Sequence, residues 1–124
     1  MHDSIFNISP LDGRYHQKVE NLCMYFSEAA LIRYRLFVEI EWFIFLCNEL
    51  KLEGTKVWKA AELKQLRALY EKFDTKIANR VKEIEKTTNH DVKAVEYYIK
   101  ENLKGAAFKP YFEFIHFACT SEDI

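Results

Sequence analysis

Residues that break helices are scarce in this chain, which has only three glycines and two prolines among its 124 residues. These five residues are Pro10, Gly13, Gly54, Gly105 and Pro110. Because the stretches between them carry no strong breaker, the sequence predicts an all-α fold. Apolar residues make up 49% of the chain, which argues against disorder and allows one domain with a modest core.

An excess of charge of one sign is also missing. The formal net charge is −1, and lysine and arginine are spread evenly among aspartate and glutamate. A protein that binds the phosphates of nucleic acid usually carries a basic stripe on its surface. The composition therefore argues against a nucleic-acid partner.

Secretory and membrane features are absent from the sequence as well. No basic stretch followed by an apolar one stands at the beginning, so we expect no signal peptide. The longest apolar stretch, residues 36–47, is interrupted by Glu39 and Glu41. It is also far shorter than the roughly 20 residues that a membrane-spanning helix needs. We expect a buried helix there and no membrane partner.

Cysteine is rare and forms no paired motif. Cys23, Cys47 and Cys119 are odd in number and far apart, which predicts free thiols in a reducing, cytoplasmic compartment. His116 and Cys119 have a spacing found in some zinc sites, but no second pair accompanies them. We therefore expect no metal and expect both side chains to pack in the core.

One long helix is expected in the first half of the chain. Residues 1–18 predict an extended arm with an Asp-Gly turn. The helix then begins between Val19 and Ser27 and ends near Leu50, and Ser27 is also a good cap for a restart. Arg35 and Glu39 stand four residues apart and can pair along this helix.

The part of this helix over residues 36–46 is apolar on nearly every side. A helix with one exposed face would carry polar residues on that face. Two alternatives follow: it is the central helix of the domain, or part of its surface meets partners.

Three amphipathic helices are predicted in the second half. Apolar residues at helical spacing predict them over residues 60–73, 75–86 and 91–103. Asp74 is placed to cap the second helix, and Gly105 stands just past the end of the third.

Residues 87–94 (TTNHDVKA) place a histidine at the start of the third helix. Thr88 or Asn89 is predicted to be its N-cap. The first-turn N–H groups and the positive end of the helix dipole then favour an anion beside His90. An imidazole can also gain or lose a proton near neutral pH. A solvated histidine next to an ordinary helix cap would give the same pattern.

Two further polar pairs stand out. Arg14 and Tyr15 place a guanidinium, which suits phosphate or carboxylate, on a turn. Thr120, with Asp123 three residues later, resembles a capping box, and Ser121 is an equally good cap. Each also has an explanation without a ligand: a solvated charge, a packed ring or a plain cap. One helical turn is unstable by itself, so we expect the chain to be part of a longer protein.

Five stretches resemble, in order and spacing, the N-terminal part of the adenylosuccinate lyase family, bacterial type, of the fumarase/aspartase superfamily. They are residues 9–15 (SPLDGRY), 25–28 (YFSE), 38–42 (VEIEW), 87–98 (TTNHDVKAVEYY) and 113–124 (EFIHFACTSEDI). The resemblance implies a helical N-terminal lyase domain over residues 1–119. Residues 120–124 would then be the first turn of the next helical domain.

The resemblance also implies a reaction, a β-elimination that releases fumarate without a cofactor. The substrates would be adenylosuccinate, which gives AMP, and the succinyl-carboxamide ribonucleotide of purine biosynthesis. The implied substrate-binding residues are Arg14, Tyr15, Asn89, His90, Asp91, Thr120 and Ser121. Arg14 and Tyr15 would bind the phosphate end of the substrate. Residues 89–91 would line the pocket, and Thr120 and Ser121 would hold a succinyl carboxylate. The histidine would bond to the substrate and could assist proton transfer.

In this family the general base and general acid lie further along the chain, outside residues 1–124, and the enzyme is a homotetramer with sites built from several subunits. We therefore expect the 124-residue chain alone to be inactive. Two alternatives stay open on the sequence alone. One is a non-catalytic helical interaction module or lyase remnant, and the other is a related lyase that acts on a different dicarboxylate substrate.

Overall fold

The structure, a computed structural model, describes residues 4–124 and contains helices and no strands within that range. The predicted all-α fold is confirmed. The chain divides into two compact units, Met1–Leu31 and Ile32–Ile124. Across residues 4–124, no helix combines the length and the apolar character needed to cross a membrane.

Short helical turns fill the first unit. A 3₁₀ turn at Ser4–Phe6 is followed by α1 (His16–Val19), a 3₁₀ turn at Glu20–Leu22 and α2 (Cys23–Phe26). The extended arm expected over residues 1–18 is therefore wrong for the described residues, and residues 1–3 lie outside them. The expected turn is present.

The turn is closed by backbone hydrogen bonds. The Asp12 N–H donates to the Ser9 carbonyl over 3.0 Å, and the Tyr15 N–H donates to the Pro10 carbonyl over 2.9 Å. Gly13 lies inside this turn, and helix α1 begins directly after Tyr15. Proline at the start of a turn sets the backbone angle that a turn needs, which explains why the chain bends here.

The long helix starts where the serine predicts. Ser27 has extended backbone, and its hydroxyl accepts a hydrogen bond from the Ala30 N–H over 3.1 Å. Helix α3 (Glu28–Ile44) follows and continues as a π-helical turn, Phe45–Glu49. The restart at Ser27 and the end near Leu50 are confirmed.

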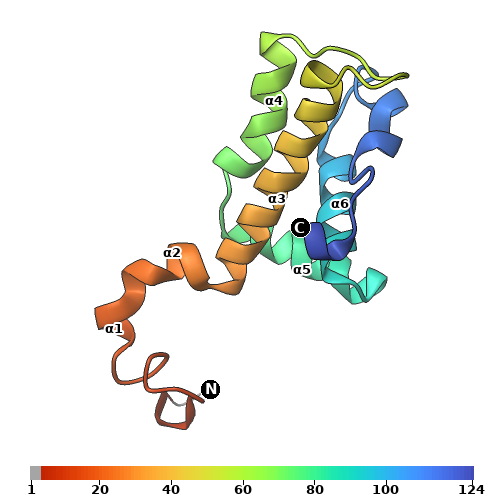
Figure 1. Cartoon of the computed structure of the whole chain (residues 1–124). Coiled ribbons are helices and arrows are strands. Elements are labelled where there is room, and N and C mark those ends of the chain that lie inside the picture. Colours follow the sequence, from red (N-terminus) through yellow and green to blue (C-terminus); the bar gives the residue numbers. More distant parts are fainter. Residues whose placement is uncertain (1–3) are drawn as a thin grey trace. The chain divides into compact units, whose positions relative to one another are not determined.

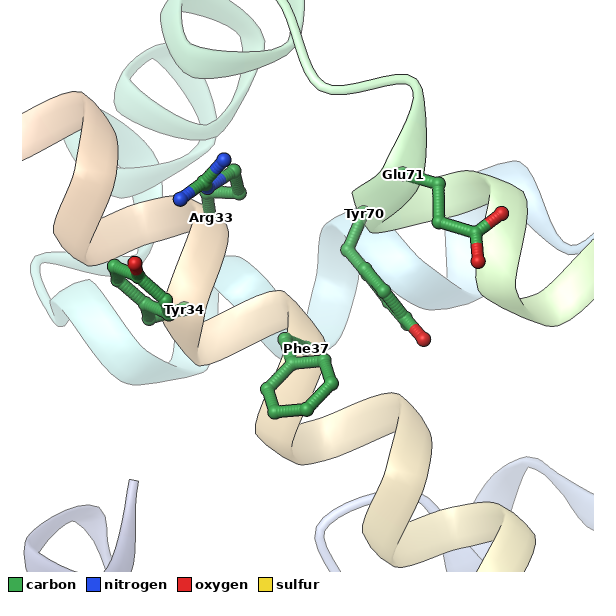
Figure 2. Close-up of a pocket in the computed structure, with 5 residues that line it drawn as sticks. All are labelled: Arg33, Tyr34, Phe37, Tyr70 and Glu71. Carbon is green, nitrogen blue, oxygen red and sulfur yellow. The ribbon is translucent and has the colours of Figure 1, made fainter. Parts of the chain in front are cut away.

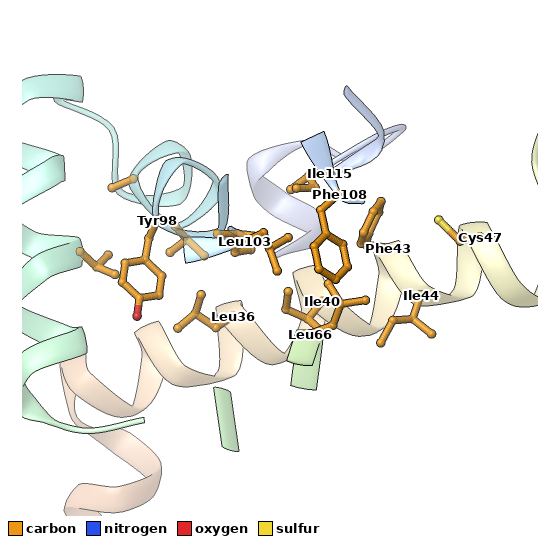
Figure 3. Packing of buried hydrophobic residues seen from close by; sticks show 14 of the residues in the cluster. Leu36, Ile40, Phe43, Ile44, Cys47, Leu66, Tyr98, Leu103, Phe108 and Ile115 are labelled. Carbon is orange, nitrogen blue, oxygen red and sulfur yellow. The ribbon is translucent and has the colours of Figure 1, made fainter. Parts of the chain in front are cut away.

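Helix α3 supplies the centre of the core in the second unit. Its fully buried side chains pack against residues from the later helices, and Figure 3 shows Phe43 and Phe108 within this cluster. Trp58 joins them, with its ring centroid 4.9 Å from that of Phe108. Yet Phe37 is 43% exposed and Phe45 is 41% exposed. The first alternative, a central helix, is confirmed. The exposed apolar side chains are compatible with the second, and contact with partners stays a prediction.

Three further helices follow α3. They are α4 (Ala60–Glu71), α5 (Thr75–Thr88) and α6 (Asp91–Asn102), close to their predicted bounds. Asp74 caps α5 as predicted, because its Oδ1 accepts from the Ile77 N–H over 2.9 Å. Figure 1 shows α4 running alongside α3, where Arg67 and Tyr70 of α4 both bond to Glu41.

The expected pair along α3 is wrong. Arg35 instead donates to Asp91 at the start of α6 over 2.8 Å, and Glu39 is bonded to His116. Arg35 and Glu39 thus each bond to a residue from another element, and not to each other. Local spacing cannot reveal such partners, since an exposed pair four residues apart stabilises by only a few tenths of a kcal/mol.

Candidate functional site

His90 lies in the connection between α5 and α6. Helix α5 runs through Thr88, and Asn89 ends it in the left-handed conformation with φ 51°. His90 then has extended backbone, and its Nδ1 accepts a hydrogen bond from the Lys93 N–H over 3.1 Å. The N-cap of α6 is therefore His90, and the expectation of Thr88 or Asn89 is wrong. Those two residues are needed to end the preceding helix.

The cap fixes the tautomer of the His90 ring. Because Nδ1 accepts from a backbone N–H, it must carry a lone pair, so in the neutral ring the proton is on Nε2. The side chain is 49% exposed. His90 thus presents an N–H donor beside the first turn of a 12-residue helix.

Asp91 is held by two donors. Its Oδ1 accepts from the Val92 N–H and its Oδ2 accepts from Arg35, each over 2.8 Å. Partial burial acts to raise the pKa of Asp91, but these two hydrogen bonds outweigh it and lower the pKa below its ordinary value. The carboxylate is therefore ionised at neutral pH and helps to fix the start of α6 against α3.

Thr120 and Ser121 form the second polar site of this unit. Thr120 precedes a short 3₁₀ turn, Ser121–Asp123, and donates its N–H to Asp123 Oδ2 over 2.7 Å and its hydroxyl to the same oxygen over 3.1 Å. The Thr120 N–H and then its hydroxyl lower the pKa of Asp123. The expected pairing of Thr120 with the acid three residues later is confirmed. Both Thr120 and Ser121 are exposed.

The segment just before Thr120 contains a pair that sequence reasoning missed. His116 Nδ1 lies 2.5 Å from Oε1 of Glu39, which is fully buried in α3. The core packing expected for His116 is wrong, because its side chain is 21% exposed and binds a carboxylate. The missed signal was Glu39 itself, since an acid within a buried apolar helix requires a partner.

Arg14 and Tyr15 belong to the first unit, where they line a pocket of about 400 Å³. The Arg14 guanidinium lies 5.3 Å from the centroid of the Tyr15 ring. The pocket is also lined by Ile5, Asn7, Ser9, Pro10 and Gly13. A cation on the wall of a concave surface fits the predicted anion-binding role, and Arg14 is the one cation among the lining residues.

A second pocket, of about 310 Å³, lies between α3 and α4 and was not predicted (Figure 2). Its lining residues are Arg33, Tyr34, Phe37, Tyr70 and Glu71. Figure 2 shows Phe37 and Tyr70 facing each other from the two helices, and their rings meet edge to face with centroids 5.0 Å apart. Burial and then the hydrogen bond to Glu41 raise the pKa of Tyr70 to about 12. This phenol is therefore a stable donor that holds α4 to α3.

The structure thus brings the predicted residues together in three groups. Asn89, His90 and Asp91 share one turn, and Thr120 and Ser121 share another. Over the described residues 4–124, no hydrogen bond or ion pair joins these two turns. In the same part of the chain, no group of three or more His, Cys, Asp or Glu side chains could hold a metal ion.

Comparison with known proteins gives one family and several relatives. A family model described as Lyase matches residues 13–124. Adenylosuccinate lyase of Dictyostelium discoideum is 50% identical over 120 residues, which cover 94% of this chain and 26% of that protein. The adenylosuccinate lyase of Legionella pneumophila (strain Corby) is 48% identical over 118 residues, covering 94% of this chain and 26% of the relative. The adenylosuccinate lyase of Escherichia coli (strain K12) is 43% identical over 122 residues, which cover 98% of this chain and 27% of that protein. The chain spans about a quarter of the length of these relatives.

Proposed function

This chain belongs to the lyase family whose model matches residues 13–124, and we propose that it serves as the N-terminal part of an adenylosuccinate lyase. Such an enzyme releases fumarate by β-elimination from adenylosuccinate and from the succinyl-carboxamide ribonucleotide of purine biosynthesis. The observation that carries the proposal is the 43% to 50% identity to adenylosuccinate lyases over nearly the whole chain.

Arg14 and Tyr15 bind the phosphate of the nucleotide in this proposal. The support is a guanidinium on the wall of a pocket, at a turn whose shape is set by its own backbone hydrogen bonds. Arginine suits a phosphate because its planar fork donates two parallel hydrogen bonds.

His90 binds the substrate as a hydrogen-bond donor, with Asn89 and Asp91 shaping the same turn. The support is the cap on Nδ1, which leaves the Nε2 proton free on a side chain that is about half exposed. A donor held by its own backbone needs little reorganisation when a substrate binds. Asp91 acts mainly through Arg35, since both of its oxygens already accept hydrogen bonds.

Thr120 and Ser121 hold a succinyl carboxylate. Removal of a proton next to that carboxylate increases its negative charge, so fixed donors there lower the barrier. The Thr120 hydroxyl is already bonded to Asp123, whereas no hydrogen bond of the Ser121 hydroxyl is found in the described part of the chain. Ser121 is therefore the more available donor, and binding at Thr120 would exchange its bond to Asp123 for one to the substrate.

The remaining parts of the proposal rest on the family resemblance. Proton removal and donation come from residues outside this chain, so residues 1–124 alone are inactive. Residues 1–119 form the helical N-terminal domain, and residues 120–124 are the first turn of the next helical domain. The whole enzyme is a cytoplasmic homotetramer that needs no cofactor. Its cytoplasmic location agrees with the three free cysteines.

The phosphate assignment can be tested in a chimeric enzyme, in which this chain replaces the corresponding residues of the Escherichia coli relative. We expect Arg14→Ala to lower kcat/KM for adenylosuccinate by about 10- to 100-fold, the worth of a hydrogen bond to a charged group. For a substrate that lacks the phosphate, kcat/KM should be the same in this variant as in the parent. Lys18→Ala is the matched control, because Lys18 also lies near the Tyr15 ring, at 5.8 Å from its centroid. Equal losses on both substrates would contradict the assignment.

A further inference from the structure

Glu39 is a charged residue in a place where the fold has no need of one. It is fully buried, on the face of α3 that also carries the buried Leu36 and Phe43. Its Oε1 is bonded to His116 Nδ1, while its Oε2 is buried and has no partner within the described part of the chain. Burial raises the pKa of Glu39 although His116 opposes that effect. An apolar residue of similar volume would usually be at least as stable in such a position.

The groups that face this pair come from two elements besides α3. Glu96 of α6 is close enough to disfavour the charged form of Glu39, and His116 adds to the effect of the Thr120 N–H and hydroxyl in lowering the pKa of Asp123. In the ionised pair (carboxylate and imidazolium) and in the neutral pair (carboxylic acid and imidazole), one proton can lie between Nδ1 of His116 and Oε1 of Glu39. The hydrogen bond therefore persists in both protonation states.

The segment that contains His116 is attached to α3 at two points. Besides the bond from His116 to Glu39, the Trp42 indole N–H donates to the Phe117 carbonyl over 2.8 Å. Glu39 and Trp42 are three residues apart and so lie on one side of the helix. Ile115, directly before this segment, is buried in the core cluster (Figure 3).

The backbone takes a rare conformation at two residues of this segment. His116 has φ 65° and Ala118 has φ 62°, both in the left-handed region. Neither is glycine, and such conformations persist only where the surroundings impose them. Two hydrogen bonds join this segment to α3, and two backbone hydrogen bonds close it, from the Phe117 N–H to the Phe114 carbonyl over 3.2 Å and from the Cys119 N–H to the His116 carbonyl over 3.3 Å. The bend ends at Cys119, and the next two residues are Thr120 and Ser121.

We propose that Glu39 is a positioning residue: by binding His116 Nδ1 it holds the bend over residues 116–119, and so it fixes Thr120 and Ser121 for binding a dicarboxylate. The first step, in which Glu39 holds the bend, stands by itself. The second step, in which the bend fixes Thr120 and Ser121 for a dicarboxylate, rests on the proposed function. Glu39 acts through His116 and does not touch the substrate. The buried carboxylate thus sets the geometry of a surface turn.

The test compares three variants of the chain by NMR of backbone amides, with succinate as the dicarboxylate probe. Glu39→Met removes the bond to His116 without leaving a buried charge. Glu39→Gln keeps an oxygen that can accept from the ring. Glu41→Met is the matched control, because Glu41 lies two residues away on the same helix but bonds to Arg67 and Tyr70.

We expect Glu39→Met to shift and broaden the amide signals of residues 116–121 and to weaken succinate binding about tenfold or more, as misplaced binding groups do. Glu39→Gln should preserve both the signals and the affinity, and Glu41→Met should change only signals near α4. If Glu39→Met leaves the signals of residues 116–121 as in the parent chain, the proposal is overturned.

Two further outcomes are informative. If succinate shifts no signal of Thr120 or Ser121 in the parent chain, the carboxylate-binding role and the second step of the proposal fail, while the amide comparison still decides whether Glu39 holds the bend. If Glu39→Met does not fold by circular dichroism, the double change of Glu39→Met with His116→Asn replaces it. Asparagine tolerates positive φ, so the same loss of order at residues 117–121 is expected, and retention of order would overturn the proposal.

Discussion

His90 has two separable roles in this account, and a pair of substitutions distinguishes them. Its Nδ1 caps α6 by accepting from the Lys93 N–H, and in the proposed function its Nε2 donates to a substrate. His90→Ala removes both roles. His90→Asn removes only the second, because asparagine is among the best N-cap residues.

The magnitude for stability follows from the cap. Losing an N-cap costs about 1 kcal/mol, within a range of roughly 0.5 to 2. The bond between Arg35 and Asp91 is made by other atoms, so it survives the change. We expect His90→Ala to lower the free energy of unfolding by about 1 kcal/mol and Tm by roughly 3 to 5 °C. His90→Asn should be as stable as the parent.

Two assays are needed. Urea unfolding of the chain, monitored by circular dichroism, measures stability, and fumarate release by the chimeric enzyme measures activity. Both His90 variants should lose about 10- to 100-fold in kcat/KM, because neither supplies the Nε2 donor. Asp74→Ala is the matched control: it removes the cap of α5 at a similar cost and should leave kcat/KM unchanged. If His90→Asn is as unstable as His90→Ala, the cap argument fails. If it restores activity, His90 serves only as a cap.

Three other results are expected. The raised pKa of Tyr70 favours the neutral phenol in the folded chain, so its contribution is complete below pH 10 and is lost as the pH rises to about 12. This contribution to the free energy of unfolding is at most about 2 to 3 kcal/mol, measured by urea unfolding of the parent and of Tyr70→Phe. If the free energy of unfolding falls equally with pH in the two proteins, the reasoning is refuted. The lowered pKa of Asp91 makes its bond to Arg35 stabilising above about pH 4 and weaker as the pH falls. A double-mutant cycle of Arg35→Met and Asp91→Asn should give a coupling of about 0.5 kcal/mol at pH 7, and strict additivity would contradict it. Val38 and Phe45 are apolar and 36% and 41% exposed, so the chain should self-associate in sedimentation experiments. Lysine at both positions should reduce this association, and a monomeric parent chain would argue against it.

Features set by neighbouring residues could be predicted from the sequence. Asp74 before a helical pattern and Ser27 before Glu28 both proved to be caps, since a cap depends only on residues within one turn. Thr120 with Asp123 is a third case. The turn at Ser9 to Tyr15 is likewise closed by bonds within itself.

Features set by distant residues could not be predicted. Glu39 and His116 are 77 residues apart in the chain, and no local pattern links them. The cap of α6 was missed by one residue because α5 extends through Thr88, which left His90 as the first residue free to cap. In each case a contact or a helix end elsewhere decided the role of the residue.

Family membership places this chain among the lyases, and its contribution to catalysis can be measured directly. The measurement is the rate of fumarate release from adenylosuccinate by the chimeric enzyme, in which residues 1–124 replace the matching residues of the Escherichia coli relative, about a quarter of its length. We predict fumarate release at a rate close to that of the relative, and none from the 124-residue chain alone. A chimera that folds and assembles as the relative does, but releases no fumarate, would contradict it.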